Sequence, residues 1–519
     1  MRKLLFTILC ITSFGVSAQL YYKLPENASK LYNEGNYWAA LDAYRELYKK
    51  NPKNLNIKLK LAVCKLMTYQ IEEALEDLKS LSTSAQKPEE TTFYYALALH
   101  FNEQYKDALK FYNQYIQTGT NAKLVSQARE NAKACKYALA ILPKKQAVTF
   151  VNAGKKVNSK FPEYNPFVMP DEGYMFYVTQ KEGTTGHVYD AKGYFASDIY
   201  ISKYKYGNWT RGRSVGQPNS YGNEKVTSIS ENGKYIVYYV DNPLSKNNLQ
   251  VAENRKKYSF NPPKKIDDKR INNNSGKQHS GVFSNDGNTF IFSSKRNGGL
   301  GGYDLYIVKK LPTGKWGEPQ NMGPEINTEK DEIYPYLYDN GQTLYFSSNG
   351  HNTIGGFDLQ KSTYDNVAKK WNSPENLGLP INTPFDDYTI CFGQNKKTAY
   401  VGMWRKDGFG EKDIYQLIFE NEEPLYTTIN AKVMYEDSSQ FTPALTIEVY
   451  NEKDELTGIY TKKQDKGSFI MVLPPGKYKI NLLQNDNIIY QESIFVKDHN
   501  LYKDFVEKKI ILKGIPKQE

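Results

Sequence analysis

Residues 283–306 read FSNDGNTFIFSSKRNGGLGGYDLY, and this stretch is one copy of a unit that recurs along the chain. Each unit contains an apolar run, a turn, a second apolar run, a glycine-rich segment, and then aspartate, an aliphatic residue and tyrosine or a near variant. The last residues of the five turns are spaced 60, 54, 54 and 56 positions apart: Gly173, Gly233, Gly287, Gly341 and Lys397. Short apolar runs bounded by glycine and asparagine are typical of β-strands, so the unit predicts a repeated β-structure.

A β-repeat of this length predicts a β-propeller in which each unit forms one blade. We therefore expect a five-bladed propeller over residues 146–422. The second unit is degenerate, because Asn248-Leu249-Gln250 replaces the aspartate motif. An outer-strand element precedes the first unit at residues 152–158. We therefore expect residues 147–152 to pair with residues 415–419 of the last unit, which closes the ring and removes exposed sheet edges.

The chain before the propeller contains a different repeat. Alanine occurs at three positions 34 residues apart, and the residues four after and twelve before each of them are equally regular. These positions are Ala40, Ala74 and Ala108, then Tyr44, Leu78 and Tyr112, then Ala28, Ala62 and Ala96. Small residues let paired helices approach closely, and a period of 34 resembles the tetratricopeptide repeat. We expect an all-α solenoid over residues 19–145, with residues 122–142 as a capping helix.

Residues 425–515 predict a third domain. Residues 429–434 and 445–450 alternate apolar and polar side chains, as strands do. A Gly-x-Phe strand at Gly467-Ser468-Phe469 is followed by the turn Pro474-Pro475-Gly476-Lys477-Tyr478. This pair of features resembles the carboxypeptidase-regulatory-like β-sandwich, and the resemblance implies a structural or adhesive role.

The first 18 residues are typical of a secretory signal peptide. Arg2 and Lys3 precede a mostly apolar stretch, and Val16-Ser17-Ala18 supplies small residues for cleavage. Cys10 raises lipidation as an alternative, but Leu9 stands where a lipoprotein site has a small residue. We expect export to the periplasm, with outer-membrane association, and no membrane span in the mature chain.

Composition excludes several classes of function. The formal net charge of +11 is modest for 519 residues, so nucleic acid is not an expected partner. Removal of the signal peptide leaves Cys64, Cys135 and Cys391, whose wide spacing predicts three small buried side chains rather than a disulfide framework or a zinc site.

The sequence offers no catalytic constellation. The five histidines are scattered among the domains, and neither a His-Glu-x-x-His helix nor a Gly-x-Ser-x-Gly elbow occurs. We therefore expect no catalytic residue, no metal ion and no cofactor. The aspartates of the repeat suggest calcium as an alternative, but one per unit at the same point indicates bonds to the backbone. Those aspartates are Asp198, Asp304, Asp358 and Asp413, and the tryptophans Trp209, Trp316 and Trp371 predict packing between blades rather than a glycan platform.

The helical repeats carry the partner-binding prediction. Inner-helix positions that line the concave face in tetratricopeptide domains are mostly apolar in this chain, so they predict a groove for a peptide or a helix. They are Tyr32, Leu59, Val63, Met67, Phe93, Leu97, His100 and Phe101. The alternative is that some of them are buried under the following helix.

The order of signal peptide, tetratricopeptide repeats, propeller with PD40-type (WD40-like) repeats and regulatory-like domain resembles the protein E-like family of the Por (type IX) secretion system of Bacteroidota. The known family member carries a further OmpA-like domain that binds peptidoglycan, and this sequence stops without one. The resemblance implies a non-enzymatic periplasmic scaffold that links envelope proteins in type IX secretion or gliding motility. A glycan- or peptidoglycan-binding protein is the second hypothesis, and a hydrolase the third.

Overall fold

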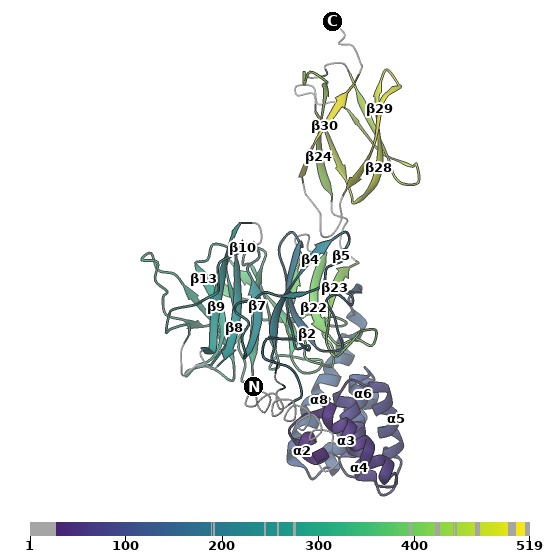
Figure 1. Ribbon diagram of the computed structural model, residues 1–519, viewed down its shortest axis with the longest axis vertical. Coiled ribbons are helices and arrows are strands. Elements are labelled where there is room, and N and C mark those ends of the chain that lie inside the picture. The colour runs from purple at the N-terminus through teal and green to yellow at the C-terminus, as the bar shows by residue number, and fades with distance from the viewer. Residues whose placement is uncertain are drawn as a thin grey trace, which may run out of the picture. The chain divides into compact units, whose positions relative to one another are not determined.

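The computed structural model describes residues 27–513, except 188, 190–191, 243–244, 257–258, 273–276, 394–396, 421–425, 440, 442–443, 462–467 and 497–504. The predicted signal peptide therefore lies outside the described residues. Two compact units are present (Figure 1). The first holds the described residues up to Met169 together with Tyr174–Cys391 and Tyr400–Leu417, and the second holds Pro170–Gly173, Phe392–Ala399 and the described residues from Ile418 onward. The helical region and most of the β-repeat thus belong to one unit.

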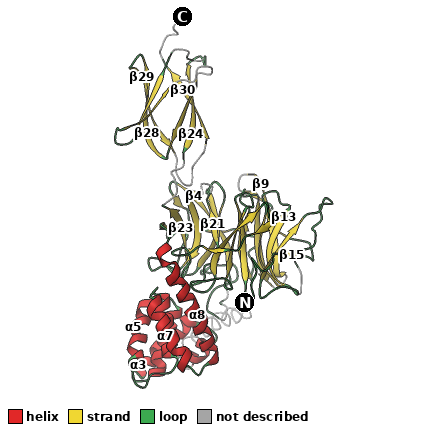
Figure 2. Ribbon diagram, turned by 180° about the vertical axis from the view of Figure 1, so that it is seen from behind, coloured by secondary structure: helices red, strands yellow, loops and turns green. Residues whose placement is uncertain are grey.

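Seven α-helices occur among the described residues, all before residue 142, and Figure 2 shows them as the red part of the chain. They are α2 (Ala28–Asn33), α3 (Tyr37–Lys50), α4 (Leu55–Met67), α5 (Ile71–Ser82), α6 (Thr91–Phe101), α7 (Tyr105–Thr118) and α8 (Ala122–Ile141). The repeated alanines Ala40, Ala74 and Ala108 are fully buried, which fits the close helix approach expected from the period of 34.

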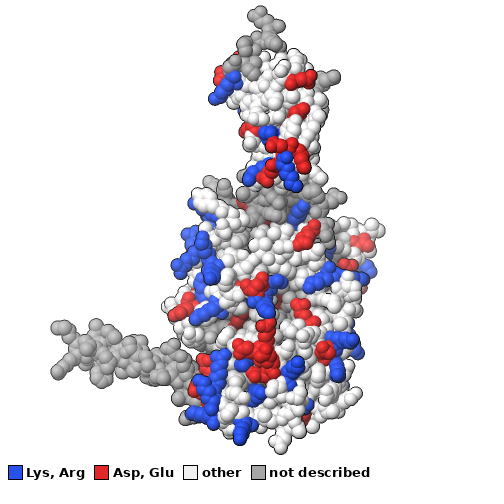
Figure 3. All heavy atoms as spheres, turned by 90° about the vertical axis from the view of Figure 1, so that its right-hand side faces the viewer, with Lys and Arg blue, Asp and Glu red and all other residues white. Residues whose placement is uncertain are grey.

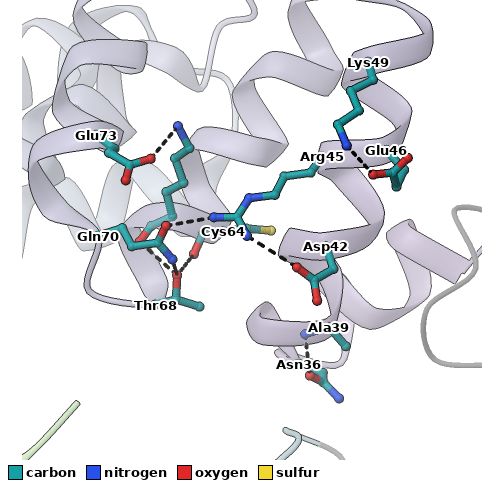
Figure 4. Close-up of polar contacts among 11 residues, drawn as sticks. Asn36, Ala39, Asp42, Arg45, Glu46, Lys49, Cys64, Thr68, Gln70 and Glu73 are labelled. Carbon is teal, nitrogen blue, oxygen red and sulfur yellow. Dashed lines mark hydrogen bonds and ion pairs between the residues drawn. The ribbon is translucent and has the colours of Figure 1, made fainter. Parts of the chain in front are cut away.

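Side-chain bonds fix where these helices begin and how neighbouring helices are linked. Asn36 Oδ1 accepts the Ala39 N–H at 3.2 Å and so caps α3. Arg45 on α3 donates to Gln70 at 3.0 Å, just before α5 (Figure 4). Thr68 Oγ1 donates to the Cys64 carbonyl at 2.8 Å and closes the end of α4. These bonds hold the turn at residues 68–70, which carries part of the site described below.

The β-repeat forms five antiparallel sheets among the described residues. The first has β2 (Glu163–Val168), β3 (Tyr174–Thr179), β4 (Asp198–Lys205), β5 (Asn208–Trp209) and β6 (Arg213–Ser214). The second has β7 (Asn223–Ile229), β8 (Tyr235–Asn242), β9 (Ser245–Lys256), β10 (Ser259–Phe260) and β11 (Lys264–Lys265). The third has β12 (Lys277–Phe283), β13 (Thr289–Lys295), β14 (Asp304–Lys309) and β15 (Gln320–Asn321). The fourth has β16 (Glu332–Tyr338), β17 (Thr343–Ser348), β18 (Asp358–Asp365), β19 (Lys370–Trp371) and β20 (Glu375–Asn376).

The fifth sheet confirms the predicted pairing of residues 147–152 with residues 415–419. It contains β21 (Ile390–Phe392), β22 (Thr398–Met403), β23 (Asp413–Phe419) and, at its edge, β1 (Val148–Asn152) from the start of the repeat region. The Ala153 N–H donates to the Ile414 carbonyl at 3.0 Å. A segment about 260 residues away in sequence therefore completes the last sheet, as the outer-strand element before the first repeat predicts.

A repeated asparagine bonds the third strand of each sheet: it follows the strand in four sheets, and in the fifth it comes from the segment after β1. In the fourth sheet, Asn382 Oδ1 accepts the Leu359 N–H at 2.8 Å, and Asn382 Nδ2 donates to the Leu359 carbonyl at 2.9 Å. The same two-bond arrangement recurs in the other sheets: Asn158 with Ile414, Asn219 with Ile199, Asn272 with Leu249, and Asn327 with Leu305. An amide suits this position because it offers one donor and one acceptor side by side.

The second unit contains two further sheets around its own core. One has β24 (Thr427–Tyr435), β27 (Ser468–Leu473) and β30 (Phe505–Leu512). The other has β25 (Thr446–Tyr450), β26 (Leu456–Thr461), β28 (Gly476–Gln484) and β29 (Asn487–Val496). Alternate residues of β24, among them Ile429, Ala431 and Val433, are buried, as the alternation in sequence predicts. Tyr478 Oη donates to the Pro474 carbonyl at 2.9 Å and fixes the Pro-Pro-Gly turn.

Candidate functional site

Most of the concave-face residues predicted to bind a partner are buried, and four of them (Met67, Leu97, His100 and Phe101) line a cavity of about 280 Å³. Tyr32, Leu59, Val63, Phe93, Leu97 and His100 are buried in the helical core, and Met67 and Phe101 are half-buried. Part of the cover comes from the following helices, which was the alternative that the sequence left open. The rest comes from the β-repeat, because Ile354 and Leu379 belong to the same apolar cluster as these helices.

His100 connects the two regions directly. Its Nε2 lies 2.8 Å from the Ile354 carbonyl, and its Nδ1 lies 3.4 Å from Tyr112 Oη. A carbonyl accepts but does not donate, so Nε2 carries the proton. Burial lowers the pKa of His100 to about 4, and the ring is therefore neutral at pH 7.

Four aromatic side chains extend this contact. Tyr69 from the turn after α4 stacks on Trp404, with ring centroids 5.9 Å apart. Phe385 lies among the other three, 4.5 Å from Phe101, 5.1 Å from Trp404 and 5.5 Å from Tyr69. We call these four residues the aromatic cluster. They also line a cavity of about 710 Å³. Aromatic packing of this kind contributes more than its buried area alone.

Polar contacts surround the aromatic cluster. Glu411 accepts from Trp38 Nε1 and from Tyr194 Oη, the latter at 2.7 Å. Burial raises the pKa of Glu411. Two exposed ion pairs, Lys330 with Glu130 and Lys406 with Glu72, also join propeller to helix. Basic and acidic side chains are interspersed on the face shown in Figure 3. Exposed ion pairs such as these two contribute little to stability. The buried contacts therefore hold the helical region in place.

We expect His100 to make this unit sensitive to acid. Its folded pKa of about 4 lies below the ordinary 6.5, so the unfolded chain binds more protons in that interval and stability falls as the pH falls. Glu163 and Asp387, whose pKa values burial raises to about 7, act in the opposite sense. Thermal unfolding of the wild type and of His100→Gln from pH 7 to pH 4 separates the effect of His100 from that of the carboxyl groups. The melting temperature of the variant is expected to fall less on acidification than that of the wild type. An identical loss in both would contradict the assignment.

A second cavity, of about 500 Å³, lies where the first strands of the five units begin. Each of the five repeats contributes the residue that follows a buried acidic or amide side chain. These lining residues are Tyr164, Lys225, His279, Ile333 and Tyr388. Tyr69 of the helical region and Lys412 of the fifth repeat also line this cavity. We call this space the channel cavity.

Irregular strand pairing shapes the channel cavity. The register between paired strands shifts at residues 164–167 of β2, 226–228 of β7, 278–280 of β12 and 333–336 of β16. Such bulges bend a strand and re-aim its side chains, and they recur next to functional sites. The bulges lie at the same position in four sheets. The side chains beside them differ from sheet to sheet, but they line one cavity.

A buried carboxylate holds the loop before the first strand in four of the five repeats, and the sequence analysis missed it. Ser159 donates through N and Oγ to Glu163, at 2.7 and 2.8 Å. The same pair of bonds joins Ser220 to Glu224, Thr328 to Glu332 and Thr383 to Asp387. The signal is present in the sequence as asparagine, then serine or threonine, then an acidic residue five positions after the asparagine.

The other candidates of the sequence analysis have structural partners. The aspartates Asp198, Asp304, Asp358 and Asp413 each accept a backbone N–H from the preceding loop, which matches the expected role. Trp209, Trp316 and Trp371 contact tyrosine or phenylalanine rings. Cys64, Cys135 and Cys391 are buried and form no disulfide among the described residues. Within the part of the chain that the structure describes, no three acidic, histidine or cysteine side chains are grouped as metal ligands would be.

Comparisons with known proteins support the helical assignment. The tetratricopeptide repeat family model matches residues 31–90. No curated protein matches the sequence significantly. Among the described helices, none has the length and apolarity needed to span a membrane.

Solved structures similar to this chain include TolB from Acinetobacter baumannii, at 14% identity over 58% of this chain and 71% of that one, with a TM-score of 0.32. A putative TolB from Agrobacterium tumefaciens is 12% identical over 64% and 98% of the two chains, with a TM-score of 0.31. The α-L-arabinofuranosidase PaAbf62A from Podospora anserina is 11% identical over 53% and 94%, with a TM-score of 0.32. The chain is thus similar to the tetratricopeptide repeat over residues 31–90 and distantly similar to these three structures.

Proposed function

We propose that this protein is a non-enzymatic scaffold of the bacterial envelope. The observation that carries the proposal is the combination of a tetratricopeptide region with a closed β-repeat and a further β-domain in one chain. Tetratricopeptide repeats imply protein–protein interaction. The buried contacts through His100 and Phe385 support a rigid body rather than two freely moving modules.

The same proposal covers the architecture of the two β-regions and the location of the protein in the cell. We propose that the five sheets are the blades of a five-bladed propeller and that the second unit is a β-sandwich of the regulatory-like type. We also propose that the chain is exported to the periplasm, where it associates with the outer membrane and acts in type IX secretion or gliding motility. The sequence of residues 1–18 and the resemblance to the Por protein E-like family support the location and the process.

Burial of the concave face changes where a protein partner is expected to bind. Six of the eight predicted residues are buried and two are half-buried, so we propose that partners contact other surfaces. Exposed side chains on the outer helix α5, such as Glu76, and on a propeller loop, such as Tyr206, offer accessible positions.

Crosslinking in cells tests the scaffold. A photoreactive amino acid placed at Glu76, at Tyr206 and, in the second unit, at Ile459 is expected to capture secretion, motility or outer-membrane proteins from at least one position. The same variants without irradiation serve as controls. Recovery of no envelope protein from any of the three positions would contradict the proposal.

A glycan- or peptidoglycan-binding role is the second candidate, and the channel cavity favours it because tyrosine side chains line it. Sedimentation with purified sacculi separates the two, since a scaffold that contacts proteins needs no cell wall. A hydrolase is the third candidate. Labelling of the purified chain by a serine-directed probe would support it, and we expect none.

A further inference from the structure

The channel cavity combines flat aromatic walls with a size suited to one small molecule. Its lining includes six tyrosines: Tyr69, Tyr164, Tyr194, Tyr303, Tyr334 and Tyr388. Tyr334 and Tyr388 lie 5.8 Å apart between ring centroids. A volume of about 500 Å³ falls within the usual range for small-molecule sites. Tyrosine offers an apolar face and a polar edge, which suits a ligand with both C–H faces and hydroxyl groups, as a sugar ring has.

The acidic side chains of the channel cavity already have donors. Asp386 accepts from the Phe357 N–H at 3.0 Å and from Tyr388 Oη at 2.9 Å. Asp331 accepts from the Tyr303 N–H at 2.7 Å and pairs with Lys295 at 3.3 Å. Glu411 accepts from Trp38 and Tyr194, as described above. These carboxylates are therefore poor candidates for holding a cation or a ligand hydroxyl.

The lysines keep donors to offer. Lys412 Nζ has three N–H groups and donates to the Asp386 carbonyl at 2.8 Å, but Asp386, Asp387 and Glu411 already act on its charge. Within the described chain, the Lys225 ammonium makes no hydrogen bond or ion pair, and it lies 5.9 Å from the centre of the Tyr164 ring. Both residues are half-buried and line the cavity. A half-buried lysine attracts an anion more strongly than an exposed one does, because the surroundings screen its charge less.

His279 stands beside Lys225 in a box of aromatic rings. Its ring centroid lies 4.8 Å from that of Tyr334, 5.3 Å from Tyr303 and 6.1 Å from Tyr239. Burial and the neighbouring Lys225 and Lys295 lower the pKa of His279 to about 3. The ring is thus neutral at pH 7. A negative charge that enters the cavity is expected to raise the pKa of His279.

We propose that the channel cavity binds a sugar that carries a carboxylate. Lys225 faces the carboxylate, and the tyrosine rings face the sugar. A cationic side chain with free donors matches one anionic group, and the surrounding rings match the body of the ligand. This inference goes beyond the scaffold function and does not depend on it.

Calorimetry on the purified full chain tests the inference, with D-glucuronate as the probe and D-glucose, glucose 6-phosphate and acetate as comparisons. Glucuronate is expected to bind at least about tenfold more tightly than glucose or acetate, which is the minimum effect of a charge-assisted contact. Lys225→Met is expected to weaken glucuronate binding at least about tenfold. Lys205→Met, which removes an exposed lysine outside the cavity, is the matched control and is expected to leave binding unchanged.

The His279 imidazole provides a second readout. Bound glucuronate is expected to raise its pKa, which nuclear magnetic resonance titration of the ring detects. No binding at about 10 mM, which corresponds to less than about 3 kcal/mol, would overturn the inference, as would equal affinity for glucose. Tighter binding of glucose 6-phosphate would overturn the carboxylate assignment. Because these measurements use the purified chain, their failure is distinct from a failure to crosslink partners in cells.

Discussion

Replacement of Asn382 by alanine is expected to lower the free energy of unfolding of the first unit by about 3 kcal/mol. Asn382 is fully buried, and its amide bonds the Leu359 N–H, the Leu359 carbonyl and Asn376 Oδ1. The carbonyl keeps the Leu377 N–H at 3.1 Å, but the Leu359 N–H is left buried without an acceptor. Such a group costs about 1–3 kcal/mol, and the lost hydrogen bonds add to it.

Urea unfolding followed by tryptophan fluorescence measures this effect. Asn372→Ala is the matched control, because Asn372 belongs to the same unit of the repeat but is exposed. The control is expected to change the free energy of unfolding by less than about 0.5 kcal/mol. A loss of similar size in both variants would show that the repeated asparagine does not hold the sheets.

Local patterns predicted the elements of this fold because their physical causes are local. The alanines at 40, 74 and 108 are buried where paired helices meet, and the outer-strand element before the first unit predicted that β1 joins β23. The aspartates of the repeat accept backbone N–H groups a few residues away. In each case a fixed spacing specified a fixed geometry.

The channel cavity was visible in the sequence only in part. The asparagine–hydroxyl–acid spacing before the first strand is regular in four of the five repeats, and attention to it would have singled out Glu163 and Asp387. The lining residues Tyr164 and Lys225 follow that motif and His279 follows Gln278 instead, and the three share no chemistry. Their convergence depends on ring closure and on the bulges in β2, β7 and β12, which the alternation of apolar residues does not reveal.

Docking of the helical region onto the propeller was not predictable from either repeat. His100 and Ile354 are 254 positions apart, and each belongs to a pattern that is complete without the other. An apolar concave face is ambiguous in sequence, since a partner protein and a neighbouring domain satisfy it equally well. In the structure, Ile354 and Leu379 of the β-repeat pack against the helices that carry this face.

Phe385→Ala is accordingly expected to release the helical region from the propeller while leaving both folded. The ring touches Tyr69, Phe101 and Trp404, so its removal takes away the centre of the aromatic cluster at a cost of about 2–4 kcal/mol. Hydrogen exchange is expected to increase in peptides that contain residues 66–70 and 97–103 and to stay unchanged in β12–β14.

The neighbouring Phe409→Ala provides the control. Phe409 is 41% exposed and lies outside the aromatic cluster, so its removal is expected to leave exchange of the helical peptides unchanged. Increased exchange throughout β12–β14 in Phe385→Ala would instead indicate global unfolding, and unchanged exchange in the helical peptides would show that the aromatic cluster does not hold them. A released helical region exposes His100 and Phe101, so the same variant shows whether the concave face captures a partner once the propeller no longer covers it.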